Sequence, residues 1–176
     1  MRTRRIRTFL LVLGCALALA SCAQPAHRAD ATDDVAFVVV RHAEKTGEPE
    51  DPALTDAGQA RAEALARSLD GAPLAAVYAT AYQRTQQTAA PTAARHGLDV
   101  TTYEAKQPAG EFADALRSRH HSGTVLVVGH SNTAPDIAAA LCGCAVAPMP
   151  ETEYGRRMVV TIGSDGRAIL AESSQP

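Results

Sequence analysis

The sequence is poor in aromatic residues and has no fixed-period internal repeat. Aromatic residues make up 4% of its 176 residues and tryptophan is absent, so alanine, valine and leucine must form the core. The lack of a repeat argues against solenoid and propeller folds. With 46% hydrophobic and 20% charged residues, the chain has the composition of one globular domain and not of a disordered or fibrous protein.

The apolar run near the amino terminus is also too short for a permanent membrane span. The apolar run over residues 9–20 covers 12 residues, whereas a spanning helix needs about 20. Four arginines precede the run, as in a secretory signal peptide. Residues 19–22 (Leu-Ala-Ser-Cys) resemble the lipobox of bacterial lipoproteins, whose cysteine, here Cys22, is lipidated. Cleavage after Ala20 and an uncleaved anchor are the alternatives.

These features predict three segments. We expect a signal peptide over residues 1–21, a flexible tether over 22–34 and one domain over 35–176. The lipid on Cys22 would hold the exported protein on the periplasmic face of the bacterial cell envelope. The membrane would therefore be contacted only through this amino-terminal anchor.

The chain has no excess of basic residues. The signal carries four of the 17 Lys and Arg residues and no acidic residue, so 13 basic and 19 acidic residues remain, a net charge of −6. No basic stripe is left to neutralise a phosphate backbone, and we therefore expect no nucleic-acid partner. Any cationic patch should be local to a binding site.

Cysteine is scarce as well. Of the four cysteines, Cys15 leaves with the signal and Cys22 would carry lipid, so Cys142 and Cys144 remain. An exported protein meets oxidising conditions, which favour a disulfide between them, although so tight a ring leaves a free or metal-linked pair as alternatives. Two cysteines do not make a zinc site, and no His or Cys lies nearby at the expected spacing. We expect no metal.

Short apolar runs alternate with helical patterns along the rest of the chain. The predicted strands cover residues 35–40, 75–78, 98–102 and 124–128, and a terminal hairpin pairs 157–162 with 167–171. The predicted helices begin after Thr55 and near residues 81, 111 and 134, and Pro91 should kink or restart the second. This alternation predicts an α/β fold, a three-layer α/β/α sandwich with a mostly parallel central sheet and an antiparallel C-terminal edge hairpin.

Two of the predicted strands end in a histidine. Residues 38–40 lead into Arg41 and His42, and residues 125–129 lead into His130. If the two strands are parallel neighbours, both imidazoles emerge at the carboxyl edge of the sheet, where ligands bind in open α/β folds. Two imidazoles beside a guanidinium suit an anion that is to be attacked, and phosphate is the obvious candidate.

Four blocks of sequence resemble those of a known family. Residues 41–44 (Arg-His-Ala-Glu) resemble the Arg-His-Gly-Glu motif of the histidine phosphatase superfamily, in its phosphoglycerate-mutase-like branch. Residues 54–58 resemble its Leu-Thr-x-x-Gly helix start, residues 84–89 its Arg-x-x-Gln-Thr-Ala stretch, and residues 128–131 its second-histidine motif. The blocks follow the family's order. The resemblance implies phosphoryl chemistry through a phosphohistidine, without a cofactor.

The chemistry of a phosphoryl group assigns the same roles. His42 is the expected nucleophile, with its other ring nitrogen bound to a backbone carbonyl and its pKa lowered by nearby arginines. Arg41 and Arg84 can offer rigid forks of donors that match phosphate. His130 would donate to an oxygen that gains charge in the transition state. Asn132 is expected in the pocket, although the residues beside it equally suit a helix N-cap.

The sequence leaves the proton donor open. The family generally uses an acidic residue between the second arginine and the second histidine, and Glu104, directly after the third predicted strand, is the first choice. Glu111, Asp114 and Asp136 are the alternatives. Glu44 either lines the pocket or pairs with a neighbouring cation.

The favoured function is a metal-independent phosphomonoester hydrolase that acts on small phosphorylated substrates. Mutase-type phosphoryl transfer is less favoured, because the short segments between the blocks leave no room for a large lid and an exported protein has no glycolytic substrate at hand. A non-catalytic lipoprotein that binds phosphate or phosphorylated glycans is the alternative from another class. It predicts phosphate binding that survives His42→Ala.

Overall fold

The fold was analysed in a computed structural model that describes residues 34–47 and 50–175. The expected signal peptide, Cys22 and nearly all of the expected tether lie outside the described residues. Among those that are described, no helix has the length and apolar character that a membrane crossing requires.

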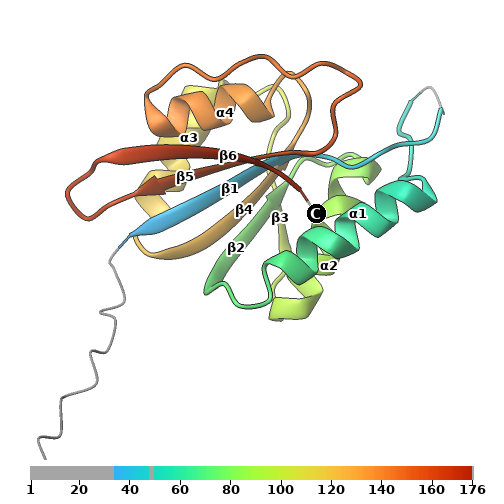
Figure 1. Cartoon of the computed structure of the whole chain (residues 1–176), viewed down its shortest axis with the longest axis horizontal. Coiled ribbons are helices and arrows are strands. Elements are labelled where there is room, and N and C mark those ends of the chain that lie inside the picture. The colour runs from blue at the N-terminus through green and yellow to red at the C-terminus, as the bar shows by residue number, and fades with distance from the viewer. Residues whose placement is uncertain (1–33, 48–49, 176) are drawn as a thin grey trace, which may run out of the picture. The chain divides into compact units, whose positions relative to one another are not determined.

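A six-stranded mixed sheet forms the centre of the domain (Figure 1). Its strands are β1 (Val35–Arg41), β2 (Leu74–Ala79), β3 (Val100–Thr102), β4 (Gly123–Gly129), β5 (Arg156–Ile162) and β6 (Ala168–Ser174). The strand order is β3-β2-β4-β1-β5-β6, with the first four strands parallel and β5 and β6 antiparallel at one edge. The predicted parallel sheet and its antiparallel C-terminal hairpin are confirmed.

Within residues 34–47 and 50–175, four helices cover the two faces of the sheet. They are α1 (Asp56–Ser68), α2 (Gln83–His96), α3 (Ala109–Arg119) and α4 (Ala134–Cys142). The helices α1 and α2 pack together below the sheet in Figure 1, whereas α3 and α4 lie above it. Pro91 lies inside α2, which continues as one helix, so the predicted restart at this residue is wrong.

The core lies on both faces of β1 and β4. Val38 and Val40 pack with Leu65 of α1 on one face, while Phe37 and Val39 contribute to the cluster under α3 and α4. Alternate residues of a strand point to opposite faces, so a strand covered on both sides must be apolar throughout. This is why the run over residues 35–40 has no polar residue.

The pairing of β1 with β4 determines where the two histidines emerge. The strands are parallel and in register, with Val40 opposite Val128 and Arg41 opposite Gly129. The backbone continues the ladder for one more bond, because the amide of His42 donates to the carbonyl of Gly129 at 2.9 Å. His42 and His130 therefore leave the sheet at the same edge.

The segment after His42 is fixed against the start of α1. Thr55 is the N-cap, and its side-chain oxygen accepts from the amide of Gly58 at 3.1 Å. The amide of Thr55 donates to the carbonyl of Glu44 at 2.9 Å. A Cβ on Gly58 would overlap that same carbonyl oxygen, so only glycine permits this close approach. The Leu-Thr-x-x-Gly block thus holds the chain beside the site.

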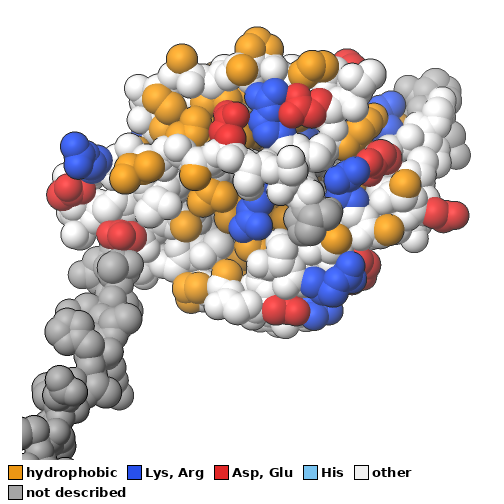
Figure 2. All heavy atoms as spheres, in the orientation of Figure 1, with side chains coloured by type: hydrophobic (Ala, Val, Ile, Leu, Met, Phe, Trp, Pro, Cys, Tyr) orange, Lys and Arg blue, Asp and Glu red, His pale blue; other side chains and the backbone are white. Residues whose placement is uncertain are grey.

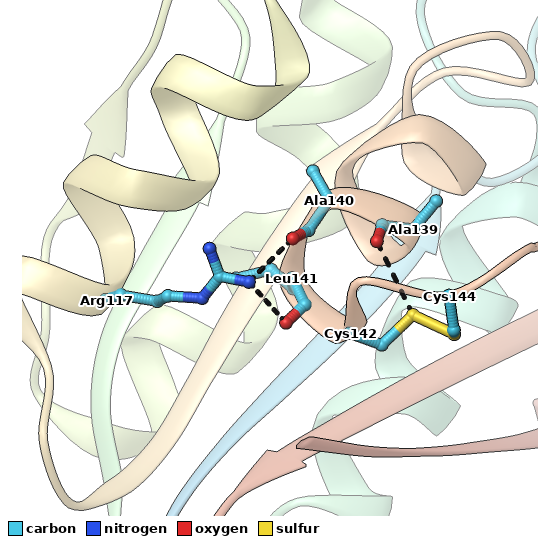
Figure 3. The surroundings of a disulfide bond; sticks show 6 residues. All are labelled: Arg117, Ala139, Ala140, Leu141, Cys142 and Cys144. Carbon is cyan, nitrogen blue, oxygen red and sulfur yellow. Dashed lines mark hydrogen bonds between the residues drawn. A yellow bond between two sulfur atoms is a disulfide. The ribbon is translucent and has the colours of Figure 1, made fainter. Parts of the chain in front are cut away.

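A disulfide joins Cys142 to Cys144 just after α4 (Figure 3), which confirms the expected pairing. In the same view Arg117 of α3 reaches the end of α4, where its Nη2 donates to the carbonyls of Ala140 and Leu141, both at 2.6 Å. A cation at the carboxyl end of a helix also stabilises the helix dipole. The chain that leaves this helix is therefore anchored where it begins its path to β5.

Six of the twelve basic side chains in the described residues pair with acidic ones. Arg95 pairs with Asp70, and Arg156 pairs with Glu153. On the face drawn in Figure 2, basic and acidic side chains lie close to one another and do not gather into patches of one sign.

Candidate active site

A cavity of about 300 Å³ opens at the carboxyl edge of the parallel strands. Both histidines line it, together with Arg84 from the first turn of α2. Asn132, which follows β4, and Glu151, which precedes β5, also line it, and the other polar residues of the wall are Lys45, Lys106, Ser131 and Thr133. The cavity thus combines side chains from segments far apart in the sequence.

The two imidazoles lie side by side in this cavity. Their ring centroids are 5.5 Å apart, and the ring planes meet at 68°. His42 is 2% exposed and His130 is 9% exposed, so both rings are largely removed from water. The structure therefore brings together the pair that the strand pattern predicts.

His42 is held as a neutral ring with a defined tautomer. Its Nδ1 lies 2.8 Å from the carbonyl oxygen of Ala43, which can only accept, so Nδ1 carries the proton and Nε2 keeps its lone pair. Burial, together with the positive charges of Arg41 and Arg84, lowers the pKa of His42 to about 3, although the hydrogen bond to Ala43 opposes the shift. Nε2 is therefore available as a nucleophile at neutral pH.

His130 is held from the opposite side of the cavity. Its Nε2 lies 3.0 Å from the hydroxyl of Thr80, and its backbone amide donates to the hydroxyl of Thr133 at 2.9 Å. Burial, together with the positive charges of Arg84 and Arg41, lowers the pKa of His130 to about 4, and the carboxylate of Glu151 opposes this shift.

Arg41 is 1% exposed and does not present a free fork to the cavity. Its Nη1 donates to three backbone carbonyls of one segment, at 3.2 Å (Pro150), 2.7 Å (Glu151) and 2.9 Å (Glu153). Its Nη2 donates to the Glu151 carboxylate at 2.9 Å, and within the described part of the chain only Nε has no partner. Most of the Arg41 donors that were predicted to bind phosphate therefore bond to protein oxygens, because the segment before β5 lies over this guanidinium.

Arg84 keeps its charge available to the cavity. Its guanidinium lies 4.3 Å from the ring centroid of Tyr82, which holds it by a cation–π contact. Its one ion pair, with Asp51, is long at 3.8 Å, and Nε finds no partner among residues 34–47 and 50–175. Arg84 is therefore the arginine best placed to bind an anion here.

Glu151 is the site residue that the sequence analysis missed. Its carboxylate accepts from Arg41 and makes a short hydrogen bond with the hydroxyl of Ser131. It lies in a segment without regular structure, beyond the last recognisable sequence block, so neither periodicity nor motif pointed to it.

The structure places two predicted acidic residues away from the cavity. Glu104 is exposed and does not line it, because Tyr103 turns inward and the next side chain turns outward. Glu44 pairs with Arg61 of α1 through bonds of 2.6 to 3.0 Å and does not line the cavity, so of the two alternatives the structure shows pairing with a cation. Asn132 does line the cavity, as predicted.

Of the alternative proton donors, Asp114 pairs with Arg117 on the surface, and Glu111 and Asp136 are exposed. None of the three lines the cavity. Within the described residues, no group of three or more His, Cys, Asp or Glu side chains is arranged to hold a metal ion.

A sequence profile for the histidine phosphatase superfamily (branch 1) matches residues 37–107, which include His42 and Arg84. The match spans the part of the chain from β1 to the segment before α3, less than half of the 176 residues. No curated protein sequence is significantly similar to it.

Several solved structures share its fold. The protein histidine phosphatase SixA complexed with tungstate is 18% identical with a TM-score of 0.63, covering 81% of this chain and 97% of that one. Bacillus stearothermophilus YhfR is 18% identical with a TM-score of 0.64, covering 78% and 95%. Phosphoserine phosphatase from Entamoeba histolytica, in complex with 3-phosphoglyceric acid, is 15% identical with a TM-score of 0.60, covering 81% and 97%.

Proposed function

We propose that this chain is a member of the histidine phosphatase superfamily and hydrolyses phosphate monoesters through a phosphohistidine on His42. The observation that carries the proposal is the neutral His42 ring, whose Nδ1 proton is engaged by Ala43 and whose Nε2 is free to attack. In the first step Nε2 forms a bond to phosphorus while the bond to the ester oxygen breaks. In the second step water displaces the imidazole and releases phosphate.

The remaining residues of the cavity would hold the phosphoryl oxygens. Arg84 supplies a guanidinium that its neighbours engage only loosely, and Asn132 supplies amide donors. His130 would donate as negative charge develops on the oxygens. Arg41 acts mainly through its charge, which helps to keep His42 neutral, and through the segment that it organises.

The test uses purified protein and p-nitrophenyl phosphate. We expect phosphate release, its loss in His42→Ala, and a base-stable, acid-labile phosphoryl group on the wild-type protein during turnover. Phosphate release by His42→Ala at the wild-type rate would contradict the proposal. Phosphate binding without any turnover by the wild-type protein would instead favour the non-catalytic alternative, and interconversion of phosphoglycerates would favour a mutase.

A phosphorylated histidine is a second candidate substrate. The SixA protein that shares this fold is named a protein histidine phosphatase. No acidic residue between Arg84 and His130 lines the cavity, so that region supplies no carboxylic acid to protonate a leaving alkoxide. An imidazole leaves from phosphorus more readily than an alkoxide does. Phosphoimidazole should therefore be hydrolysed at a higher kcat/KM than an alkyl phosphate, and the reverse order would exclude this candidate.

We also propose that the protein is exported and anchored by lipid on Cys22. The disulfide between Cys142 and Cys144 suits an oxidising compartment. Mass spectrometry of the amino-terminal peptide should find an acylated Cys22, and Cys22→Ser should move the protein from the membrane fraction to the soluble one. Cys15→Ser is the matched control. An unmodified Cys22 in the mature protein would contradict the anchor.

A further inference from the structure

The carboxylate of Glu151 bridges the ends of the two central strands. It accepts from Nη2 of Arg41 at 2.9 Å and also bonds to the hydroxyl of Ser131. Arg41 directly precedes His42, and Ser131 directly follows His130. The carboxylate is therefore tied to the chain neighbour of each imidazole and lies in the wall of the same cavity.

The backbone around Glu151 is held as firmly as its side chain. The three carbonyls bound by Arg41 belong to residues 150, 151 and 153, so a buried guanidinium fixes this segment at its centre. The segment also brings the ring of Tyr154 to 4.1 Å from the Arg41 guanidinium. A residue positioned this way, in a stretch without regular structure, can keep a defined place beside the reacting atoms.

The protonation state of this carboxylate suits the second step of the reaction, attack by water, better than the first step, in which the ester oxygen leaves. The Ser131 hydrogen bond and the positive charge of Arg41 hold the pKa of Glu151 below its ordinary value, so the group is ionised at neutral pH. An ionised carboxylate cannot give a proton to a leaving alkoxide, but it can take one from water. Its side chain is 78% exposed, so water reaches it and the proton can return to solvent.

We propose that Glu151 is the general base that activates water for hydrolysis of the phosphohistidine, which rests on the proposed function of His42. The water oxygen forms a bond to phosphorus, the bond between phosphorus and Nε2 breaks, and its electron pair returns to the imidazole. The water proton passes to the Glu151 carboxylate, phosphate leaves, and the carboxylic acid releases the proton to solvent. Ser131 positions the carboxylate for this step.

The decisive experiment compares wild type with Glu151→Gln in rapid-mixing assays with p-nitrophenyl phosphate. Gln keeps the size of the side chain and one acceptor oxygen, but it is not a base. Because only the second step is slowed, we expect a burst of about one p-nitrophenol per site followed by slow turnover. The kcat should fall by about 10²-fold or more. The kcat/KM, which reports the steps up to release of p-nitrophenol, should stay within about twofold of wild type.

Two further readouts are specific to this role. The phosphohistidine on His42 should accumulate in Glu151→Gln, detected by mass spectrometry at alkaline pH. Different esters should then share one kcat, because their common second step limits the rate. Ser131→Ala, which loses only the orienting bond, should show the same pattern with a fall in kcat of about tenfold. This second variant keeps the test valid if Glu151→Gln folds poorly.

Glu153→Gln is the matched control. Its side chain pairs with Arg156 in the same segment, and its backbone carbonyl would still accept from Arg41. Its kinetics should match wild type, as should those of Glu104→Gln.

Three outcomes would overturn the role of Glu151. A fall in kcat/KM without a burst would place its effect before the phosphohistidine forms. If Glu151→Gln had an unchanged kcat and bound inorganic phosphate more tightly, the Glu151 carboxylate would instead be a group that the substrate displaces from Arg41. A burst in Glu104→Gln instead would assign the base there. If wild type forms no phosphohistidine at all, the proposed function fails first.

Discussion

The hydroxyl of Thr80 lies 3.0 Å from Nε2 of His130 and determines which nitrogen of that ring carries the proton. The hydroxyl of Thr85 donates to the carbonyls of Thr80 and Tyr82, at 2.9 and 2.8 Å. It therefore accepts from the Thr80 hydroxyl, 2.8 Å away, and the Thr80 oxygen accepts from Nε2–H of His130. Nδ1 becomes a donor only when the ring is protonated, which a bound phosphate dianion favours.

Replacement of Thr80 by Val should test whether the Thr80 hydroxyl determines the tautomer of His130. Val keeps the shape of the side chain but leaves Nε2 of His130 without a partner, at a cost of about 1–3 kcal/mol. We expect kcat/KM for p-nitrophenyl phosphate to fall about tenfold or more, and Thr80→Ser, which keeps the hydroxyl, to retain most of the activity. Equal activities of the Val and Ser variants would show that the hydroxyl does not act on His130.

The histidine pair should make the domain less stable in acid. The pKa values of His42 and His130 are lowered to about 3 and about 4 in the folded protein, against 6.5 in the unfolded chain. Between pH 6.5 and about 4 the unfolded state therefore binds more protons, so the free energy of unfolding falls as the pH is lowered. Urea unfolding at pH 7 and pH 5 should show this loss, and it should be smaller in a His42→Gln, His130→Gln double variant. Histidine signals that titrate near pH 6.5 in NMR spectra would contradict it.

The two arginines of the site should respond differently to replacement by lysine. A lysine at position 41 cannot serve three carbonyls and a carboxylate at once, and the buried partners would be left unpaired. We expect Arg41→Lys to lower the free energy of unfolding by about 3 kcal/mol or more. Among the described residues Arg84 makes one long ion pair and a cation–π contact with Tyr82 that a lysine can also make, so Arg84→Lys should unfold like wild type while losing most of its kcat/KM. The measurements are urea unfolding and steady-state kinetics, and equal stabilities of the two variants would be the contrary result.

The disulfide should contribute modestly to stability and little to catalysis. A loop of three residues has little entropy to lose, and the chain-entropy estimate is about 1.6 kcal/mol. A Cys142→Ser, Cys144→Ser variant should unfold at a lower urea concentration and keep a wild-type kcat. Mild reduction of the wild-type protein should have the same effect. A large fall in kcat would mean that the bond also holds the segment that carries Glu151.

Much of the fold is predictable because its signals are local. The apolar runs of β1 and β4 are continuous, since both faces of these strands are covered, and their ends place His42 and His130 at one edge. The cap of α1 at Thr55 was likewise visible in the sequence. Such features depend on neighbours within a few residues.

The carboxylates of the site depend on longer-range contacts. Glu151 reaches Arg41 across 110 residues, from a segment with no periodicity to reveal it. Glu104 was favoured for following a strand, but β3 ends at Thr102 and the inward turn of Tyr103 sends the next side chain outward. The sequence leaves the role of Glu44 open, because the approach of Arg61, 17 residues away, depends on how α1 docks.

The chain enters the sheet at Val35, and the cavity lies where the same strand ends. Seven residues of strand span about 23 Å, so entry point and catalytic groups are separated by the full height of the sheet. The point where the chain joins the sheet and the cavity therefore lie at opposite ends of β1.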